Sequence, residues 1–170
     1  MEQADAPPSG IRDQRPDDDL RDRHVIVAGF GPIGRTAVQK LEDAGVQVTV
    51  IELNEQTIEH LLERQRQVVQ GDVTRPDTLR AARIEQAQAL ILTIPDEEAA
   101  VAACRVAREL NPGIFIAART NFLSKGLLAT QAGADEVVVE EVVTAEAMQR
   151  AVMGYLVPRP TRAAVPESGR

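Results

Sequence analysis

The sequence has few aromatic residues, a single cysteine and no long apolar run. Its 170 residues include three phenylalanines, one tyrosine and no tryptophan, so stacking platforms for single-stranded nucleic acid are not expected. The one cysteine, Cys104, excludes an intramolecular disulfide and a cysteine-rich metal centre. No stretch reaches the roughly 18 apolar residues of a membrane-spanning helix, and the N-terminal residues lack the apolar core of a signal peptide. We therefore expect a cytoplasmic domain without a metal site.

Positive charge is also scarce. The chain carries 26 acidic and 19 basic residues, a formal net charge of −7 and a pI near 4.9. A protein that binds the phosphate backbone of nucleic acid needs a basic face, so nucleic-acid partners are not expected. Hydrophobic residues make up 44% of the chain. That fraction is sufficient for a packed core, which must be built mainly from Val, Ile, Leu and Ala.

The two ends of the chain differ from its middle. Residues 1–22 and 157–170 are rich in proline and charge and poor in large apolar side chains. Such segments bury too little apolar surface to offset the entropy lost on ordering. We expect a flexible acidic N-terminal segment over 1–22, one folded domain over 23–156 and a flexible tail over 157–170.

Strand-like and helix-like segments alternate through the middle of the chain. The predicted strands cover residues 24–28, 46–51, 67–70, 87–92, 114–118 and 136–139. The predicted helices cover residues 32–44, 54–65, 76–82, 96–110, 122–132 and 142–155. Strands that are apolar throughout are buried on both faces, which is typical of a parallel sheet. The pattern predicts a Rossmann-like, doubly wound α/β fold: a six-stranded parallel sheet in a three-layer αβα sandwich, with strand order 3-2-1-4-5-6.

A glycine-rich turn lies between the first predicted strand and the first predicted helix. Gly29, Gly31 and Gly34 match the spacing G-x-G-x-x-G, in the strand–turn–helix context that nucleotide binding requires. The first glycine permits a tight turn, the second lets the backbone approach a pyrophosphate, and the third lets the helix pack closely on the sheet. The free N–H groups of the helix N-terminus favour an anion at this place.

An acidic residue, Glu52, ends the second predicted strand about 20 residues beyond the motif. A carboxylate there accepts hydrogen bonds from ribose hydroxyls and repels a 2′-phosphate. No Lys or Arg follows in "ELNEQ" to bind such a phosphate. The sequence therefore predicts NAD or another adenine nucleotide rather than NADP.

Six stretches in order and spacing resemble one known family: "VIVAGFGPIGRTAV", "VTVIELNEQTIEHL", "VVQGDVTRPDTLRAA", "AQALILTIPDEEAAVAACRVARELNP", "IFIAART" and "AGADEVV". Together they resemble the N-terminal lobe of the RCK (regulator of potassium conductance) domain, the Trk/Ktr/Kef-type NAD-binding (TrkA-N) domain. The likeness covers residues 24 to about 155. It implies a cytoplasmic regulatory domain that senses NAD(H), with AMP or ATP/ADP as alternatives, and performs no chemistry.

The same resemblance implies partners. Members of that family control a potassium channel, a potassium transporter or a cation:proton antiporter. The membrane subunit would be part of the same polypeptide as this domain or a separate chain. The domain would then be held at the membrane through that partner. We also expect a homodimer, because the last predicted helix carries more apolar residues than a terminal helix needs, although this face could instead pack on its own sheet. We expect no second lobe after residue 156, because residues 157–170 are poor in large apolar side chains.

The resemblance places a ligand site at the carboxyl ends of the strands. The implied nucleotide-binding residues are Gly29, Phe30, Gly31, Pro32, Ile33, Gly34, Arg35, Glu52, Leu53, Asp72, Val73, Thr74, Thr93, Ile94 and Arg119. Asp72 would meet the adenine amino group, and Arg119 would lie near ligand phosphates. Three of them have another interpretation: Asp72 could form an Asx turn or a helix cap, Thr93 could simply end a strand, and Arg119 could form a surface ion pair.

Catalytic groups are not evident. His24 opens a strand at the end away from the expected site, and His60 has the spacing of a helix surface residue. Cys104 lies among Ala and Val in a helix and is typical of a core residue. We expect no catalytic residue and no enzyme activity. Two alternatives stay open: a small NAD-dependent oxidoreductase, and a structural dimerisation module with an empty cleft.

Overall fold

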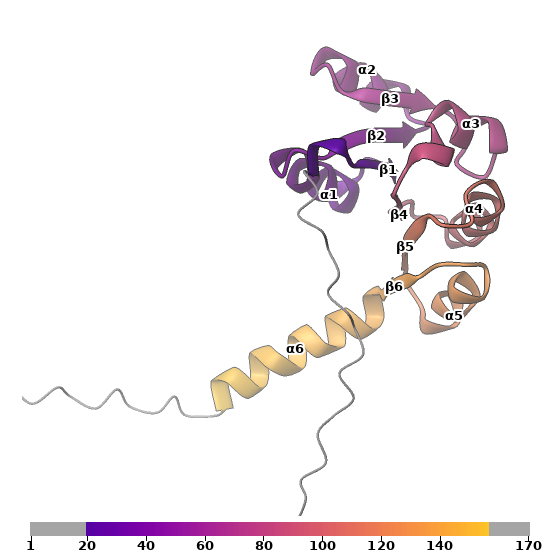
Figure 1. Cartoon of the computed structure of the whole chain (residues 1–170). Coiled ribbons are helices and arrows are strands. Elements are labelled where there is room, and N and C mark those ends of the chain that lie inside the picture. The colour runs from indigo at the N-terminus through magenta and orange to yellow at the C-terminus, as the bar shows by residue number, and fades with distance from the viewer. Residues whose placement is uncertain (1–19, 157–170) are drawn as a thin grey trace, which may run out of the picture.

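Six parallel strands form one sheet in the order β3-β2-β1-β4-β5-β6, as the sequence predicts (Figure 1). The computed structural model describes residues 20–156. The strands are β1 (His24–Ala28), β2 (Gln47–Glu52), β3 (Gln67–Gln70), β4 (Ala89–Leu92), β5 (Phe115–Thr120) and β6 (Glu136–Val139). The helices are α1 (Pro32–Asp43), α2 (Glu55–Glu63), α3 (Pro76–Ala81), α4 (Glu97–Leu110), α5 (Leu123–Gln131) and α6 (Glu140–Leu156), with the short 3-10 helices η1 (Leu20–Asp22) and η2 (Ile84–Gln86).

The end segments are only partly within the described residues. Residues 1–19 and 157–170, both predicted to be flexible, lie outside them. Residues 20–22, which were also assigned to the flexible segment, form the short helix η1. The Gln47 side chain donates a hydrogen bond to the carbonyl oxygen of Arg21 at 3.2 Å, which ties this turn to the start of β2.

Local signals set most helix starts. Pro32 and Pro76 occupy the first turns of α1 and α3, where the missing N–H has no intrahelical partner to lose. The Asn54 side chain accepts from the N–H of Thr57 at 2.9 Å at the start of α2. Asp96 accepts from the N–H of Ala99 at 3.0 Å at the start of α4. These caps satisfy backbone donors that the helices leave free.

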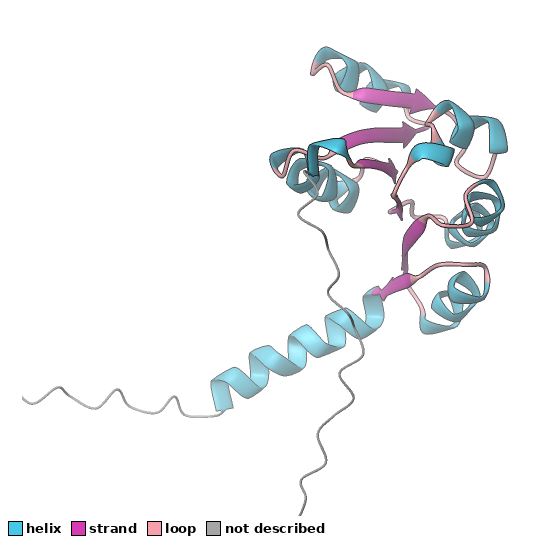
Figure 2. Cartoon of the chain, in the orientation of Figure 1, coloured by secondary structure: helices cyan, strands magenta, loops and turns pink. Residues whose placement is uncertain are grey.

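Helices cover the two faces of the sheet unequally. α1 and α2 lie on one face, while α3, α4 and α5 lie on the other (Figures 1 and 2). On the α1 side, Val27, Val38 and Val50 belong to one core cluster. On the α4 side, Leu90, Leu92, Ile116 and other side chains form a second, larger cluster. The chain changes faces between β3 and β4, which places the crossover point at the adjacent ends of β1 and β4.

Among the described residues, β5 and β6 have no helix packed over their α1-side face, whereas Ala89 and Ile91 of β4 are partly buried against the α1-side cluster. The side chains of β5 and β6 on that face alternate with the buried ones, so Phe115 is 50% exposed and Val138 is 46% exposed. The prediction that these apolar strands are buried on both faces was therefore wrong for β5 and β6. A mostly apolar hollow of about 510 Å³ lies on this face, and Ile91, Ala117 and Val138 are among the residues that line it.

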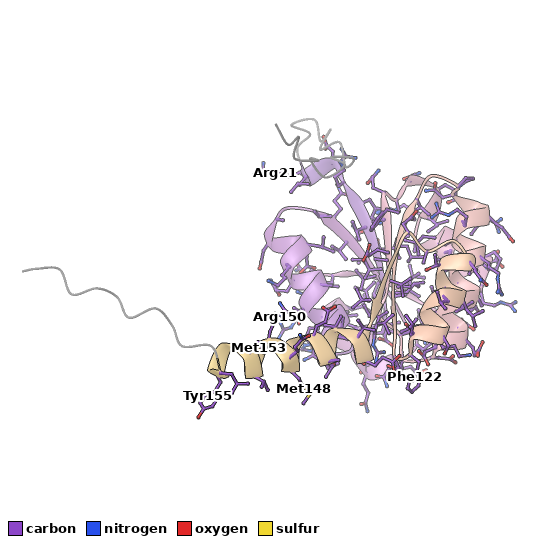
Figure 3. All side chains as sticks on the ribbon, turned by 90° about the horizontal axis from the view of Figure 1, so that it is seen from below. Arg21, Phe122, Met148, Arg150, Met153 and Tyr155 are labelled. Atoms are coloured by element: carbon purple, nitrogen blue, oxygen red, sulfur yellow. The ribbon has the colours of Figure 1, made fainter. Side chains whose placement is uncertain are left out.

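The last helix leaves the domain instead of covering that hollow. α6 has no buried residue, and it projects away from the sheet, with Met148, Met153 and Tyr155 outside the body of the domain (Figure 3). It begins at Glu140, two residues before the predicted start. Within residues 20–156, no helix has the length and apolar character needed to cross a membrane.

Candidate functional site

A cleft of about 400 Å³ lies at the carboxyl ends of β1, β2, β3 and β4. Nine of the fifteen residues that the sequence implied for ligand binding line it: Gly29, Phe30, Gly31, Glu52, Leu53, Asp72, Val73, Thr93 and Ile94. They come from four separate segments of the chain. The cleft therefore occupies the crossover point of the sheet, where open α/β sheets bind their ligands.

The glycine turn has the geometry of a phosphate cradle. Gly29 has φ +94°, a conformation that residues with a Cβ rarely adopt. A Cβ on Gly34 would lie 2.1 Å from the carbonyl oxygen of Gly29, so only glycine lets α1 start this close to β1. A Cβ on Gly31 would meet nothing within 4 Å. Gly31 thus leaves open space beside the N-terminus of α1, where an anion is electrostatically favoured.

Thr93 braces the turn from the neighbouring strand. Its buried hydroxyl donates to the carbonyl oxygens of Ala28, at 3.0 Å, and of Gly29, at 3.1 Å. Its backbone N–H also donates to Ala28 at 2.9 Å. Thr93 is more than the end of a strand, because it holds the first glycine of the turn in position.

Glu52 is the last residue of β2, and its carboxylate accepts hydrogen bonds from three backbone N–H groups. Oε2 accepts from the N–H of Phe30 at 2.9 Å. Oε1 accepts from the N–H groups of Leu53, at 2.7 Å, and Asn54, at 3.0 Å. A carboxylate offers about four acceptor positions, so roughly one remains for a ribose hydroxyl. Glu52 therefore orders the glycine turn whether or not a ligand is present.

Asp72 follows β3 and forms an Asx turn, which was predicted from the sequence as the alternative to a contact with adenine. Its Oδ1 accepts from both the N–H and the hydroxyl of Thr74 at 2.8 Å. These two hydrogen bonds, the backbone one first, lower the pKa of the Asp72 carboxyl below its usual value. Asp72 lines the cleft, and among residues 20–156 its Oδ2 has no hydrogen-bond partner. The carboxylate is thus oriented by Thr74 and keeps one oxygen for a ligand.

A sequence profile of the TrkA-N domain matches residues 25–140. This chain belongs to the TrkA-N domain family. The match begins at the second residue of β1 and ends at the first residue of α6, so it contains all of the sheet except His24, and the whole cleft, whereas α6 continues beyond it.

Named relatives are channels and antiporters. The chain is 30% identical over 122 residues to Potassium channel protein 1 of Methanocaldococcus jannaschii, covering 71% of this chain and 37% of that protein. It is 32% identical over 125 residues to the putative cation/proton antiporter YbaL of Escherichia coli K12, covering 74% of this chain and 22% of YbaL. The chain thus spans well under half the length of these relatives.

Solved structures give the same picture. The crystal structure of the TrkA-N domain of YbaL superimposes with a TM-score of 0.74 and 31% identity, covering 76% of this chain and 96% of that domain. The GsuK channel bound to NAD gives a TM-score of 0.63 and 30% identity, covering 73% of this chain and 22% of the channel. The likeness to both structures confirms the predicted Rossmann-like fold.

Six of the implied ligand residues lie outside the cleft of this TrkA-N domain: Pro32, Ile33, Gly34, Arg35, Thr74 and Arg119. The Arg35 guanidinium lies over the ring of Phe30, 5.8 Å from its centroid. Ile33 lines the open-face hollow. Arg119 forms an ion pair with Glu140 at 2.5 Å, which is the second interpretation that its position allowed.

Six further residues line the cleft but were not predicted from the sequence: Ala28, Ile51, Gly71, Pro95, Asp96 and Ala99. Asp96 also caps α4 through the N–H of Ala99. Three of these residues, Pro95, Asp96 and Ala99, belong to the stretch "IPDEEA", which directly follows Thr93 at the end of a central strand. Position at a strand end would have identified these residues as candidates.

No histidine, cysteine, tyrosine or lysine of the described residues lines the cleft. Cys104 is fully buried, and burial raises the pKa of its thiol to about 11. His24 lies at the opposite end of β1, where burial lowers the pKa of the imidazole and Nε2 lies 2.9 Å from the hydroxyl of Thr49. Within residues 20–156, no group of three or more His, Cys, Asp or Glu side chains could hold a metal ion.

Proposed function

We propose that this TrkA-N domain binds NAD(H), or another adenine nucleotide, as a regulatory signal for potassium transport or cation:proton exchange. The glycine turn carries the proposal. Gly29 and Gly34 are fixed by conformation and close packing, while Gly31 leaves unfilled space beside the N-terminus of α1. Such a turn has no need of an open second glycine unless another molecule approaches the backbone there.

The residues around the turn fit such a ligand. Pyrophosphate oxygens would accept from the backbone N–H groups at Gly31 and the start of α1. The remaining acceptor position of Glu52 would bind a ribose hydroxyl. Asp72 Oδ2 would accept from the adenine amino group. The NAD-bound structure of the GsuK channel, which has the same fold, supports NAD as the first ligand to test.

The composition of the cleft favours sensing over catalysis. Its titratable side chains are Glu52, Asp72 and Asp96, and each already accepts hydrogen bonds from backbone N–H groups. Hydride transfer to a substrate needs a positioned proton donor or acceptor beside the nicotinamide. We therefore propose that the nucleotide is bound and released unchanged, and that its binding shifts the population of conformations of an attached membrane protein.

The partner is proposed from the relatives. A potassium channel and a putative cation/proton antiporter both contain a segment like this chain as a minor part of their length. The membrane part would be a channel, transporter or antiporter, on the same polypeptide or on a separate subunit. We place the domain on the cytoplasmic side of the membrane, where it would meet the adenine nucleotides of the cell.

A second copy of the chain is the proposed occupant of the open face. The hollow there is apolar and bordered by α6, whose first turns contribute Val143 and Thr144. α6 itself exposes Met148, Val152 and Met153 and continues away from its own sheet. Burying each helix against a second copy in a two-fold dimer would remove both apolar surfaces from water.

Ligand binding is tested by thermal denaturation with NAD, NADH, NADP, ATP, ADP and AMP in turn. A ligand that binds only the folded state raises the midpoint temperature by mass action. We expect the largest shift with NAD or NADH, and its loss in Glu52→Ala. If none of the six raises the midpoint, the chain is a structural module with an empty cleft. Reduction of NAD with a supplied alcohol, or oxidation of NADH with a supplied carbonyl, would instead indicate an oxidoreductase.

The dimer is tested by light scattering coupled to gel filtration. We expect the mass of two chains for the native sequence and of one chain for Val138→Asp and Val152→Asp, which place a charge in the open-face hollow or on α6. Leu62→Asp is the matched control, because Leu62 is 57% exposed on α2, away from both surfaces. A native chain that elutes as a monomer at high concentration would contradict the dimer without affecting nucleotide binding.

Regulation of transport is tested in cells. Gly31→Ala, introduced into the chromosomal gene, should alter the potassium or proton flux of the attached transporter while leaving the amount of protein unchanged. A flux that is the same in both strains over a range of external potassium and pH would contradict the proposed partner class.

A further inference from the structure

The first residue of α6 is held by Arg119 at the end of β5. The Arg119 Nε donates to Glu140 Oε1 at 2.5 Å, and its Nη2 donates to Asn121 Oδ1 at 2.9 Å. Its Nη1 reaches the carbonyl oxygen of Ile94 at 3.4 Å. Ile94 lines the nucleotide cleft. One guanidinium therefore lies between a wall of the cleft and the start of the helix that leaves the domain.

Asn121 is a second junction between the same segments. Its N–H donates to Glu97 Oε1 at 2.6 Å, and Glu97 is the residue after the cleft residue Asp96. Its carbonyl oxygen accepts from the N–H of Glu141 at 3.2 Å. Glu141 in turn accepts from the N–H of Leu123 at 2.7 Å. The start of α6 is thus tied to the turn after β5, and that turn is tied to the segment that forms the cleft wall.

These contacts have a large share in setting the direction of α6. None of its residues is buried within its own chain, so no packed core of its own domain fixes its angle to the sheet. The Arg119–Glu140 pair is partly exposed, with 19% and 38% of the two side chains accessible. A partly exposed ion pair contributes little stability, so α6 can change direction at small cost.

We infer that Arg119 couples occupancy of the nucleotide cleft to the direction of α6, by exchanging Glu140 for a ligand phosphate. The inference rests on the proposed binding of a nucleotide in the cleft. A bound pyrophosphate places negative charge near Gly31, on the cleft side of Ile94, and competes with Glu140 for the guanidinium. When Arg119 turns toward the phosphate, Glu140 loses its partner, and within residues 20–156 the start of α6 is then held only through the hydrogen bonds of Glu141 with Asn121 and Leu123.

Arg119 and Glu140 each stabilise the charged form of the other. The hydrogen bond from Arg119 lowers the pKa of the Glu140 carboxyl, and the hydrogen bond to Glu140 raises the pKa of the Arg119 guanidinium. Both groups stay charged near neutral pH. An anion that attracts Arg119 therefore competes with the ionised carboxylate of Glu140. By linkage, a change in the direction of α6 must alter nucleotide affinity as much as the nucleotide alters that direction.

Glu140→Gln removes that competitor while keeping an acceptor of the same length. Because Arg119 is then free to meet a phosphate, we expect the nucleotide that stabilises the native chain to bind about fivefold tighter or more, at the lower limit of typical coupling. Calorimetric titration measures the dissociation constant. Lys125→Gln is the matched control: Lys125 pairs with Glu98 between α5 and α4 without touching α6, and its loss should leave the affinity unchanged.

The direction of α6 is read by electron–electron spin distances. Labels at Glu59→Cys on α2 and Tyr155→Cys near the end of α6 report it, and the buried Cys104 stays unlabelled. Dilution with unlabelled chain removes distances between copies. We expect the nucleotide to change the distance distribution of the native pair. We expect Glu140→Gln to change it without nucleotide, and Lys125→Gln to respond as the native sequence does.

The outcomes separate the two proposals. If the nucleotide binds but the distances do not change, or if Glu140→Gln binds it with equal or weaker affinity, the coupling is wrong and the binding site stands. If no nucleotide binds the native chain, the proposed function and the coupling are both wrong. Tighter binding together with altered distances supports the coupling, because the loss of one carboxylate charge alone would tighten binding of an anion without moving α6.

Discussion

A Cβ atom at Gly34 would lie 2.1 Å from the carbonyl oxygen of Gly29 and 2.7 Å from the hydroxyl of Thr93. The start of α1 is therefore packed directly against the turn that follows β1. Gly34→Ala must push α1 away from the sheet, and we expect it to lower the free energy of unfolding by about 2 kcal/mol, as overpacking of a core does. Urea denaturation followed by circular dichroism measures this loss. A stability equal to that of the native chain would contradict the packing.

Gly31→Ala separates ligand binding from stability in the same turn. Gly31 has φ −66°, which alanine adopts without strain, and an added Cβ meets no atom within 4 Å. The methyl group would enter the space proposed for the pyrophosphate. We expect native stability and a loss of nucleotide affinity of about tenfold or more, which is roughly 1.4 kcal/mol of binding free energy. Unchanged affinity in a calorimetric titration would show that no ligand approaches the turn here.

Glu52 should contribute to stability as well as to binding. Glu52→Ala leaves the N–H groups of Phe30, Leu53 and Asn54 without the acceptor that they share. We expect the free energy of unfolding to fall by about 1–2 kcal/mol, because water replaces only part of these hydrogen bonds. The measurement is urea denaturation without nucleotide. A variant as stable as the native chain would mean that the carboxylate serves the ligand alone.

The anchor of α6 should weaken in acid. Arg119 lowers the pKa of the Glu140 carboxyl below its ordinary value of 4.5. A group with a lowered folded pKa contributes fully above its unfolded pKa, and the contribution is lost as the pH falls through the folded value. We expect the spin-label distances between α2 and α6 to stay constant from pH 8 to about pH 5 and to broaden below about pH 4. Glu140→Gln should show no such transition.

Cys104 should be inert in the folded chain. Burial raises the pKa of its thiol to about 11, and the reactive form of cysteine is the thiolate. We expect almost no reaction with a disulfide reagent at pH 8 in buffer and complete reaction of one thiol in denaturant. Rapid reaction of the folded chain would show that α4 opens readily and that Cys104 is more accessible than its packing indicates.

Much of the domain follows from local pattern. The strands, the two proline-initiated helices and the turn at Gly29 were predicted because each depends on residues within a few positions of one another, and the strand order followed from the doubly wound fold type. Boundaries shifted where side chains distant in sequence intervened. β4 starts at Ala89, two residues late, because Asn111 donates to the carbonyl oxygens of Ile84 and Ala87 and holds the preceding segment in another conformation.

The candidate site was predicted in part for the same reason. Strand ends and glycine spacing identified the nine cleft residues that the sequence named. They could not show that Glu52 holds the backbone of Phe30, or that Arg119 pairs with Glu140, since the partners are about 20 residues away. Both relationships exist only because parallel strands bring their carboxyl ends to one edge of the sheet.

The sequence by itself determined the strands, the helices and the glycine turn, because periodicity and turn chemistry are local properties, and the alternation of strands and helices indicated a doubly wound order. Only the tertiary structure decided which faces are covered. The apolar pattern of β4–β6 is the same whether a helix of this chain, a second copy or solvent lies above it. The path of α6 decides which of these occurs within the chain. It leaves the sheet at Glu140 and keeps all its side chains accessible, so the α1-side face of β5 and β6 stays uncovered by residues 20–156.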